Sequence, residues 1–97
     1  MDKRKEFNVL KRKIIPVLKK YNVKKAGVFG SYARYAQKKS SDVDLLIQPP
    51  NDFSLVDLAG LEIVLEKLLR KRVEVLSYNG LSPFLRSTIL REEVRII

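Results

Sequence analysis

Residues 25–47 read KAGVFGSYARYAQKKSSDVDLLI, and the elements predicted within them indicate the fold class. Its first five residues form a short apolar run that stops at Gly30-Ser31, which is typical of a buried strand leading into a turn. A brief helix is expected next, from Ser31 to Gln37. The stretch therefore begins with a strand, a tight turn and a short helix.

The second half of this stretch predicts another strand. Residues 42–47 alternate acidic and apolar side chains before they become wholly apolar, and Pro49-Pro50 ends the run. Side chains two residues apart in a strand point to the same face, so Asp42 and Asp44 stand side by side, with Cα atoms roughly 6.5–7 Å apart. Val43 faces the other way.

Outside this stretch, the spacing of apolar residues indicates further elements. The segment 7–21 has helical periodicity, and Pro16 predicts a kink or a break within it. Ser54 followed by Asp57 resembles a helix start. The remaining elements are expected at 55–69 (a long apolar helix), 72–76 (a strand), 83 to about 91 (a short helix) and 94–97 (a terminal strand).

These elements combine into one small α/β (α+β) domain that covers residues 1–97. Strands that alternate with helices predict a small mixed β-sheet backed by helices, open on the face that carries the acidic side chains. The length of 97 residues and the apolar content of 45% are sufficient for one folded core. No internal repeat, low-complexity segment or long linker divides the chain.

The composition excludes several classes of chemistry. The sequence has no Cys and no His, which removes disulfide scaffolds, thiolate nucleophiles and imidazole catalysis. Any chemistry must therefore depend on carboxylates, hydroxyls, backbone amides and cations, and any metal should be a hard, oxygen-bound ion such as Mg²⁺. No signal peptide or membrane span is visible, so a cytoplasmic location is expected.

Three carboxylates are candidate metal ligands. Asp42 and Asp44 share one strand face, and Glu74 lies between two valines of the strand at 72–76, so it joins them if the two strands pair. Like charges on adjacent sheet positions destabilise one another, and one bound divalent cation or a pair of them reverses this effect. On a simpler interpretation Asp42 and Asp44 are solvated acids, and Glu74 is either an ordinary exposed strand residue or the salt-bridge partner of Arg72.

Gly30-Ser31 is a candidate phosphate site. Glycine lets a ligand approach the backbone closely, and the first amides of the following helix can bind phosphate together with the Ser31 hydroxyl. Ten residues separate this turn from the paired acids. A phosphate site followed by paired carboxylates is typical of a polyphosphate bound together with a metal ion.

The order Gly30-Ser31, ten residues, Asp42-Val43-Asp44 resembles the Gly-Ser-x10-Asp-x-Asp motif of nucleotidyltransferases related to DNA polymerase β. The surrounding sequence, VFGSYAR at 28–34 and SDVDLLI at 41–47, is most similar to the minimal nucleotidyltransferase (MNT) subfamily. The resemblance implies a polymerase β palm-like core that binds Mg·ATP. Many members of the subfamily are antitoxins of HEPN-domain ribonuclease toxins, and some transfer AMP to a tyrosine of the toxin.

The resemblance also implies a role for each matched residue. Gly30 and Ser31 would hold the β- and γ-phosphates of ATP, while Asp42 and Asp44 would ligate the Mg²⁺ ions of a two-metal site. Glu74 takes the place of the third carboxylate, which in the family is usually Asp. That residue ligates the metal shared with the attacking hydroxyl and helps to deprotonate it.

The expected function is Mg²⁺-dependent transfer of AMP from ATP to a hydroxyl of a partner toxin. Arg34 matches the arginine that follows the turn in the family, where it either contacts phosphate or pairs with an Asp. An alternative is a non-catalytic antitoxin or nucleotide-binding subunit that neutralises its partner by stoichiometric binding. The longer side chain of Glu74 favours this alternative, whereas the intact motifs favour the enzyme.

Two surfaces predict partners. The helix at 55–69 carries apolar side chains on more than one face, so part of it predicts an interface with a toxin or with a second copy of the chain. Residues 1–25 hold ten basic and two acidic side chains, within a chain of net charge +9. This basic helix is compatible with a solvated face, with contact to RNA or with an acidic protein.

Overall fold

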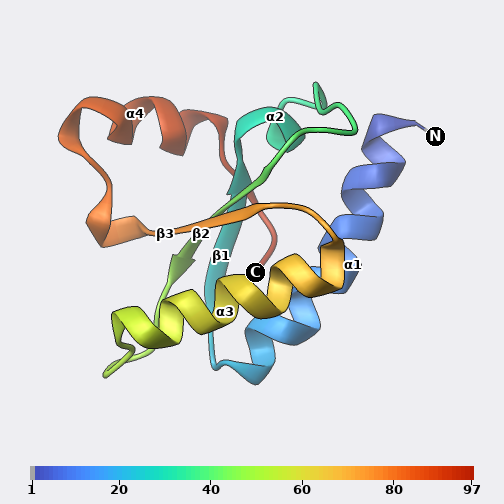
Figure 1. The fold of residues 1–97 in the computed structure, drawn as a ribbon. Helices are drawn as coiled ribbons and strands as arrows, with labels where there is room; N and C mark the ends of the chain where they lie inside the picture. The colour runs from blue at the N-terminus through green and yellow to red at the C-terminus, as the bar shows by residue number, and fades with distance from the viewer. Residues whose placement is uncertain (1) are drawn as a thin grey trace.

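A computed structural model describes residues 2–97 of the chain and contains helices on both faces of a sheet (Figure 1). The elements follow one another in the order α1 (Lys3–Lys20), β1 (Lys25–Phe29), α2 (Gly30–Ala33), β2 (Val43–Gln48), α3 (Leu55–Leu69), β3 (Val73–Ser77), the 3₁₀ helix η1 (Tyr78–Gly80), α4 (Pro83–Glu92) and β4 (Val94–Arg95). None of these helices combines the length and the apolar content that a membrane span requires.

The four strands form one mixed sheet in the order β3-β2-β1-β4. β1 pairs antiparallel with β2 and with β4, whereas β2 pairs parallel with β3. The parallel pair requires a crossover connection, and α3 supplies it. The predicted fold class, a small mixed sheet backed by helices, is therefore confirmed.

The main core lies between one face of the sheet and the helices α1 and α3, which Figure 1 shows on the same side. Each helix contributes its apolar stripe, and each central strand contributes alternate residues. The side chains that are completely buried there include Ile14, Leu18, Val28, Val43, Leu45, Ile47, Leu61 and Leu65. The long helix α3 starts where the sequence predicts, at the capping box formed by Ser54 and Asp57.

The opposite face of the sheet is covered only in part. A small cluster of Leu46, Tyr78 and Leu81 packs there with Ile89 of α4 and with two strand residues, Phe29 and Leu76. The Tyr78 hydroxyl donates a hydrogen bond to Glu93. This cluster lies over the carboxyl end of β2. The amino end of the same strand, next to Asp44, stays open.

Two predicted helix boundaries are wrong. The helix expected from Ser31 to Gln37 ends at Ala33, because Tyr35 adopts a left-handed backbone conformation with φ 53°. The chain then turns so that buried Gln37 donates from Nε2 to the carbonyl of Lys3 at 2.9 Å. A long-range hydrogen bond to α1 thus replaces about one further turn of helix.

A break at Pro16 is also wrong, because α1 runs from Lys3 to Lys20 as one helix, and of the two predicted alternatives only a kink stays a prediction. Pro16 is exposed, so the carbonyl four residues earlier can be solvated after it loses its hydrogen bond. At the other end of the chain, regular pairing is shorter than predicted. β4 stops at Arg95, although Ile96 and Ile97 still donate to the carbonyl of Ala26.

We predict that Pro16→Ala stabilises the protein, since the helix already bears the cost of an interior proline. The expected gain is about 1–3 kcal/mol in the free energy of unfolding. Urea denaturation followed by circular dichroism measures this difference. A loss of stability would show that Pro16 makes a compensating contribution that the helix needs.

Candidate active site

The parallel register of β2 and β3 positions two of the candidate site residues, because it places Asp44 directly opposite Glu74. Val43 and Val73 precede these two residues and are buried in the main core. Because side chains alternate along a strand, Asp44 and Glu74 project from the open face of the sheet. Neighbouring strands lie roughly 4.8 Å apart, so the two carboxylates are close neighbours.

Asp42 joins the pair from the chain just before β2, because the strand begins at Val43, one residue later than the sequence predicts. It shares a face with Asp44, since the two residues flank buried Val43. The Val43 amide donates to the carbonyl of Arg72 at 2.9 Å, which extends the β2–β3 pairing to this point. Asp42 is exposed, whereas Asp44 is half-buried.

The electrostatics of the site disfavour its own negative charge. The pKa of Asp44 is raised from 3.8 to about 6, first by burial and then by repulsion from Glu74 and Asp42. The positive charge of Arg34 acts in the opposite direction. A cation held between these carboxylates would remove the repulsion that raises the pKa.

Gly30 brings the start of α2 against the same carboxylates. Phe29, the last residue of β1, pairs with Asp44, and Gly30 then turns the chain with φ 73°. A Cβ atom at Gly30 would overlap with the Asp44 carboxylate, so both the conformation and the space require glycine. Ser31 follows in the first turn of α2, where backbone amides have no partner within the helix.

Arg34 lies beyond the last turn of α2 and does not pair with an aspartate. Its Nη1 atom donates to Glu92 Oε2 of α4 at 2.9 Å. The sequence gives no local signal for this ion pair, because 58 residues separate its members. Of the two roles considered for Arg34, contact with phosphate stays a prediction, and an ion pair with Glu92 takes the place of the one with Asp.

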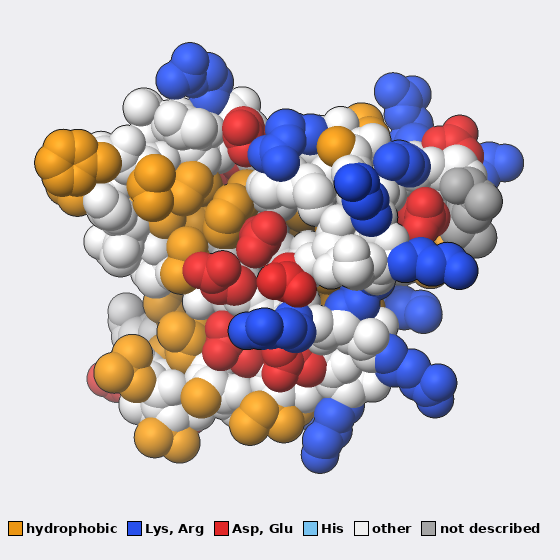
Figure 2. Space-filling model, turned by 45° about the horizontal axis from the view of Figure 1, so that its top comes forward, with side chains coloured by type: hydrophobic (Ala, Val, Ile, Leu, Met, Phe, Trp, Pro, Cys, Tyr) orange, Lys and Arg blue, Asp and Glu red, His pale blue; other side chains and the backbone are white. Residues whose placement is uncertain are grey.

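Two acidic residues that sequence analysis missed lie beside the predicted ligands. Glu62 and Glu66 of α3 line a hollow of about 300 Å³ together with Asp42, Arg72, Val73 and Glu74. Figure 2 shows acidic side chains gathered in the middle of one face, with a basic side chain among them. The spacing of four residues between Glu62 and Glu66 indicates a shared helix face, but the sequence does not show that this face meets β3.

The donor set fits a hard divalent cation. Within residues 2–97, no three acidic side chains surround a common point closely enough to hold a metal ion by themselves. Mg²⁺ does not require such a cage, because it is usually held by one or two carboxylates, water and substrate phosphates. Asp42, Asp44 and Glu74 can supply the carboxylates, and the Gly30-Ser31 turn lies next to Asp44.

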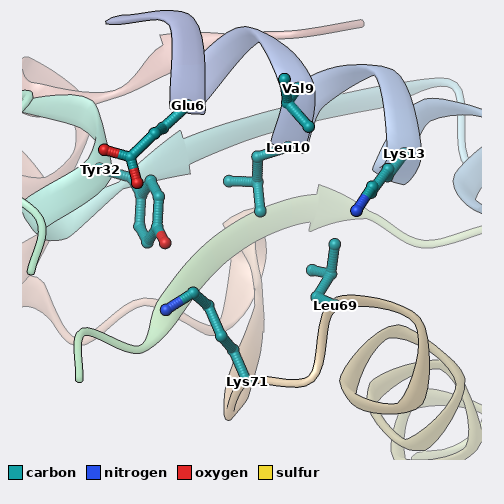
Figure 3. A pocket seen from close by; sticks show the side chains of 7 residues that line it. All are labelled: Glu6, Val9, Leu10, Lys13, Tyr32, Leu69 and Lys71. Carbon is teal, nitrogen blue, oxygen red and sulfur yellow. The ribbon is translucent and has the colours of Figure 1, made fainter. Parts of the chain in front are cut away.

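A second hollow, of about 200 Å³, lies between α1, Tyr32 and the end of α3. Figure 3 shows the side chains of Glu6, Lys13 and Lys71 around its opening. It contains none of the predicted site residues, although Tyr32 is the neighbour of Ser31 in the chain.

The fold and the site together define a nucleotidyltransferase of the polymerase β type. Residues 12–97 match the family model described as Polymerase beta, Nucleotidyltransferase, so the chain belongs to this family. A protein of Methanocaldococcus jannaschii assigned as a protein adenylyltransferase is 49% identical over 91 residues, which cover 94% of this chain and 98% of that protein. The protein adenylyltransferase MntA of Thermococcus cleftensis is 39% identical over 77 residues, covering 79% and 78% of the two chains.

Solved structures agree with this assignment. A structure assigned as a minimal nucleotidyltransferase superposes with a TM-score of 0.80 at 34% identity, covering 97% of this chain and 95% of that one. A chain of the tri-AMPylated Shewanella oneidensis HEPN toxin in complex with its MNT antitoxin has a TM-score of 0.75 at 17% identity, covering 94% and 71%. The second likeness concerns the fold alone. The resemblance inferred from the sequence motifs is thus confirmed.

We predict that Asp44→Asn stabilises the metal-free protein in a pH-dependent way. The folded-state pKa of about 6 exceeds the ordinary value of 3.8, so ionisation of Asp44 costs more in the folded than in the unfolded chain. The stability that Asp44 contributes is complete below about pH 4 and is lost as the pH rises through about 6. Melting temperatures in EDTA should show a gain for Asp44→Asn at pH 7.5 that disappears at pH 4. An equal gain at both values would contradict the assigned repulsion.

Proposed function

We propose that this chain is an Mg²⁺-dependent protein adenylyltransferase and the antitoxin of a HEPN/MNT pair, which transfers AMP from ATP to a tyrosine hydroxyl of the toxin. One observation carries the proposal: Asp44 and Glu74 stand in register on an open sheet face, next to the Gly30-Ser31 turn. The names of the two relatives support the transfer of adenylate, and the Shewanella oneidensis complex supports a HEPN partner.

Each group of the site has a part in this reaction. Gly30 and Ser31 anchor the β- and γ-phosphates of ATP through backbone amides and the Ser31 hydroxyl. Asp42, Asp44 and Glu74 hold Mg²⁺. When bound, the metal neutralises charge on the triphosphate and makes the α-phosphorus a better electrophile. Arg34 already pairs with Glu92, so it would contact phosphate only through its remaining donors.

The transfer step is a displacement at phosphorus. The tyrosine oxygen of the partner attacks the α-phosphorus, and the bond from that atom to the oxygen bridging the α- and β-phosphates breaks. Pyrophosphate leaves with the electron pair of this bond, and the phenolic proton passes to Glu74. The products are a tyrosine that carries AMP through a phosphodiester and free pyrophosphate.

The outward face of α3 is the surface that we assign to the protein partner. The apolar side chains exposed there, as the sequence predicts, are Leu55, Val56, Ile63, Val64 and Leu68. Val56 and Ile63 are 80% and 52% exposed and lie seven residues apart, so they form one line along the helix. A second copy of this chain is the other occupant to test.

We predict that the co-purified toxin gains the mass of one or more AMP units when it is incubated with this chain and Mg·ATP. Intact-mass spectrometry detects the gain. Asp42→Asn/Asp44→Asn should abolish it without dissociating the complex, because both residues lie outside the assigned protein interface. A stable complex with no mass gain for the natural chain would favour the non-catalytic antitoxin instead.

We predict that Ile63→Glu weakens toxin binding about tenfold or more, because it places a charge in the middle of an apolar interface. Isothermal titration calorimetry measures the affinity. Asn8→Glu is the matched control, since it adds the same charge at an exposed position of α1. Unchanged toxin affinity, with a shift of the free chain from dimer to monomer, would assign the face to self-association.

We also propose RNA contact through the outward face of α1. Lys5, Arg12 and Lys19 are exposed and seven residues apart, which places their charges along one line at intervals of roughly 10.5 Å. The only acidic residue within α1 is Glu6. Such a row of cations fits a phosphate backbone.

We predict that RNA affinity falls steeply with salt, and that replacing these three residues by Gln reduces the slope of log K against log[salt] by about two to three. Fluorescence anisotropy with RNA and DNA oligomers of equal length measures both slopes. The proposal fails if the three substitutions leave RNA affinity unchanged, or if they weaken toxin binding only.

A further inference from the structure

The free edge of β3 is occupied by side chains instead of another strand. β3 is the outermost strand of the order β3-β2-β1-β4, so only one of its sides is paired with backbone. In a parallel pair, alternate residues direct their backbone groups away from the neighbouring strand. Val73 and Val75 are such residues, and their amides would otherwise be free for pairing with another chain.

Two glutamates of α3 accept hydrogen bonds from these amides. The Val73 amide donates to Glu66 Oε2 at 3.0 Å, and the Val75 amide donates to Glu62 Oε2 at 2.9 Å. Hydrogen bonds to a carboxylate are stronger than those to a neutral acceptor. The two contacts together form a clamp between α3 and the outer edge of β3.

The spacing of the two glutamates along α3 matches the spacing of the two amides along β3. Glu62 and Glu66 are four residues apart, which is a rise of roughly 6 Å along a helix. Val73 and Val75 are two residues apart, which is roughly 6.6 Å along a strand. The order of the contacts is reversed, as expected when the chain turns back between α3 and β3.

The single residue between the two clamped amides is Glu74, whose side chain lies on the open face beside Asp44. We propose that Glu62 and Glu66 are positioning residues that fix the backbone of Glu74 for the transfer reaction. The inference rests on the proposed function, in which Glu74 takes part in the transfer of AMP. Misplacement of a reacting group by about 1 Å costs on the order of 100-fold in rate.

The competing explanation is that Glu62 and Glu66 act through their charge, because they line the same hollow as Asp42 and Glu74. Substitutions separate the two roles. Glutamine keeps a side-chain oxygen that accepts a hydrogen bond but removes the charge, whereas alanine removes both. Lys67→Ala is the matched control, since it shortens an exposed side chain of the same helix.

The first measurement is amide hydrogen exchange by NMR on the protein without its partner. Glu66→Ala should accelerate exchange of the Val73 amide, and Glu62→Ala that of the Val75 amide, each by about tenfold or more. The Gln variants and Lys67→Ala should leave both rates close to those of the natural chain. Unchanged exchange in the Ala variants would overturn the clamp, and the single variants keep the test valid if the double variant does not fold.

The second measurement is AMP transfer to the co-purified toxin. Glu62→Ala/Glu66→Ala should lower kcat about tenfold or more with little change in KM for ATP, and Glu62→Gln/Glu66→Gln should restore it. Faster exchange without a loss of kcat would overturn the positioning role. A loss of kcat in the Gln variant with protected amides would assign the effect to charge.

A third measurement separates failure of this inference from failure of the proposed function. If the natural chain transfers no AMP, its affinity for Mn²⁺ can still be measured by electron paramagnetic resonance. The Ala pair should then weaken Mn²⁺ binding and the Gln pair should not, because only the position of Glu74 differs between them. Equal affinity in all variants would overturn the inference.

Discussion

The in-register parallel pairing of β2 with β3 determines how the site is built, because it places the like charges of Asp44 and Glu74 side by side. Adjacent carboxylates on a sheet are unfavourable by themselves. The pairing is held by the opposite face of the same strands, where Val43, Leu45 and Val75 are buried against α1 and α3. The hydrophobic core thus holds the two strands together against the electrostatic repulsion between Asp44 and Glu74.

Several structural elements position the residues of the site, each in a different way. Gly30 permits the close approach of α2 to Asp44, and the crossover helix α3 delivers β3 parallel to β2. The same helix holds the outer edge of β3 through two carboxylates and presents an apolar row to solvent on another side. The contacts that position Glu74 and the surface that we propose for a partner therefore lie on the same helix.

Sequence reasoning predicted the parts of this arrangement that follow from local periodicity. Strand alternation placed Asp42 and Asp44 on one face and predicted that Glu74 joins them if the strands pair. The pairing of β2 with β3 confirms that Asp44 lies beside Glu74, and Asp42 is near enough to repel Asp44. It could not predict the Arg34–Glu92 ion pair, which joins residues 58 positions apart. Nor could it predict the continuous helix through Pro16 or the early end of α2, because solvent exposure and a distant hydrogen bond decide these boundaries.

We propose that a divalent cation relieves the repulsion among these carboxylates, and the ionisation of Asp44 reports this directly. A ¹³C NMR titration of its carboxyl carbon should give a pKa of about 6 in the metal-free protein. In saturating Mg²⁺ with a non-hydrolysable ATP analogue, the pKa should fall below its ordinary value of 3.8, since the cation favours the carboxylate. A pKa that does not change when Mg²⁺ and the nucleotide are added would contradict the account.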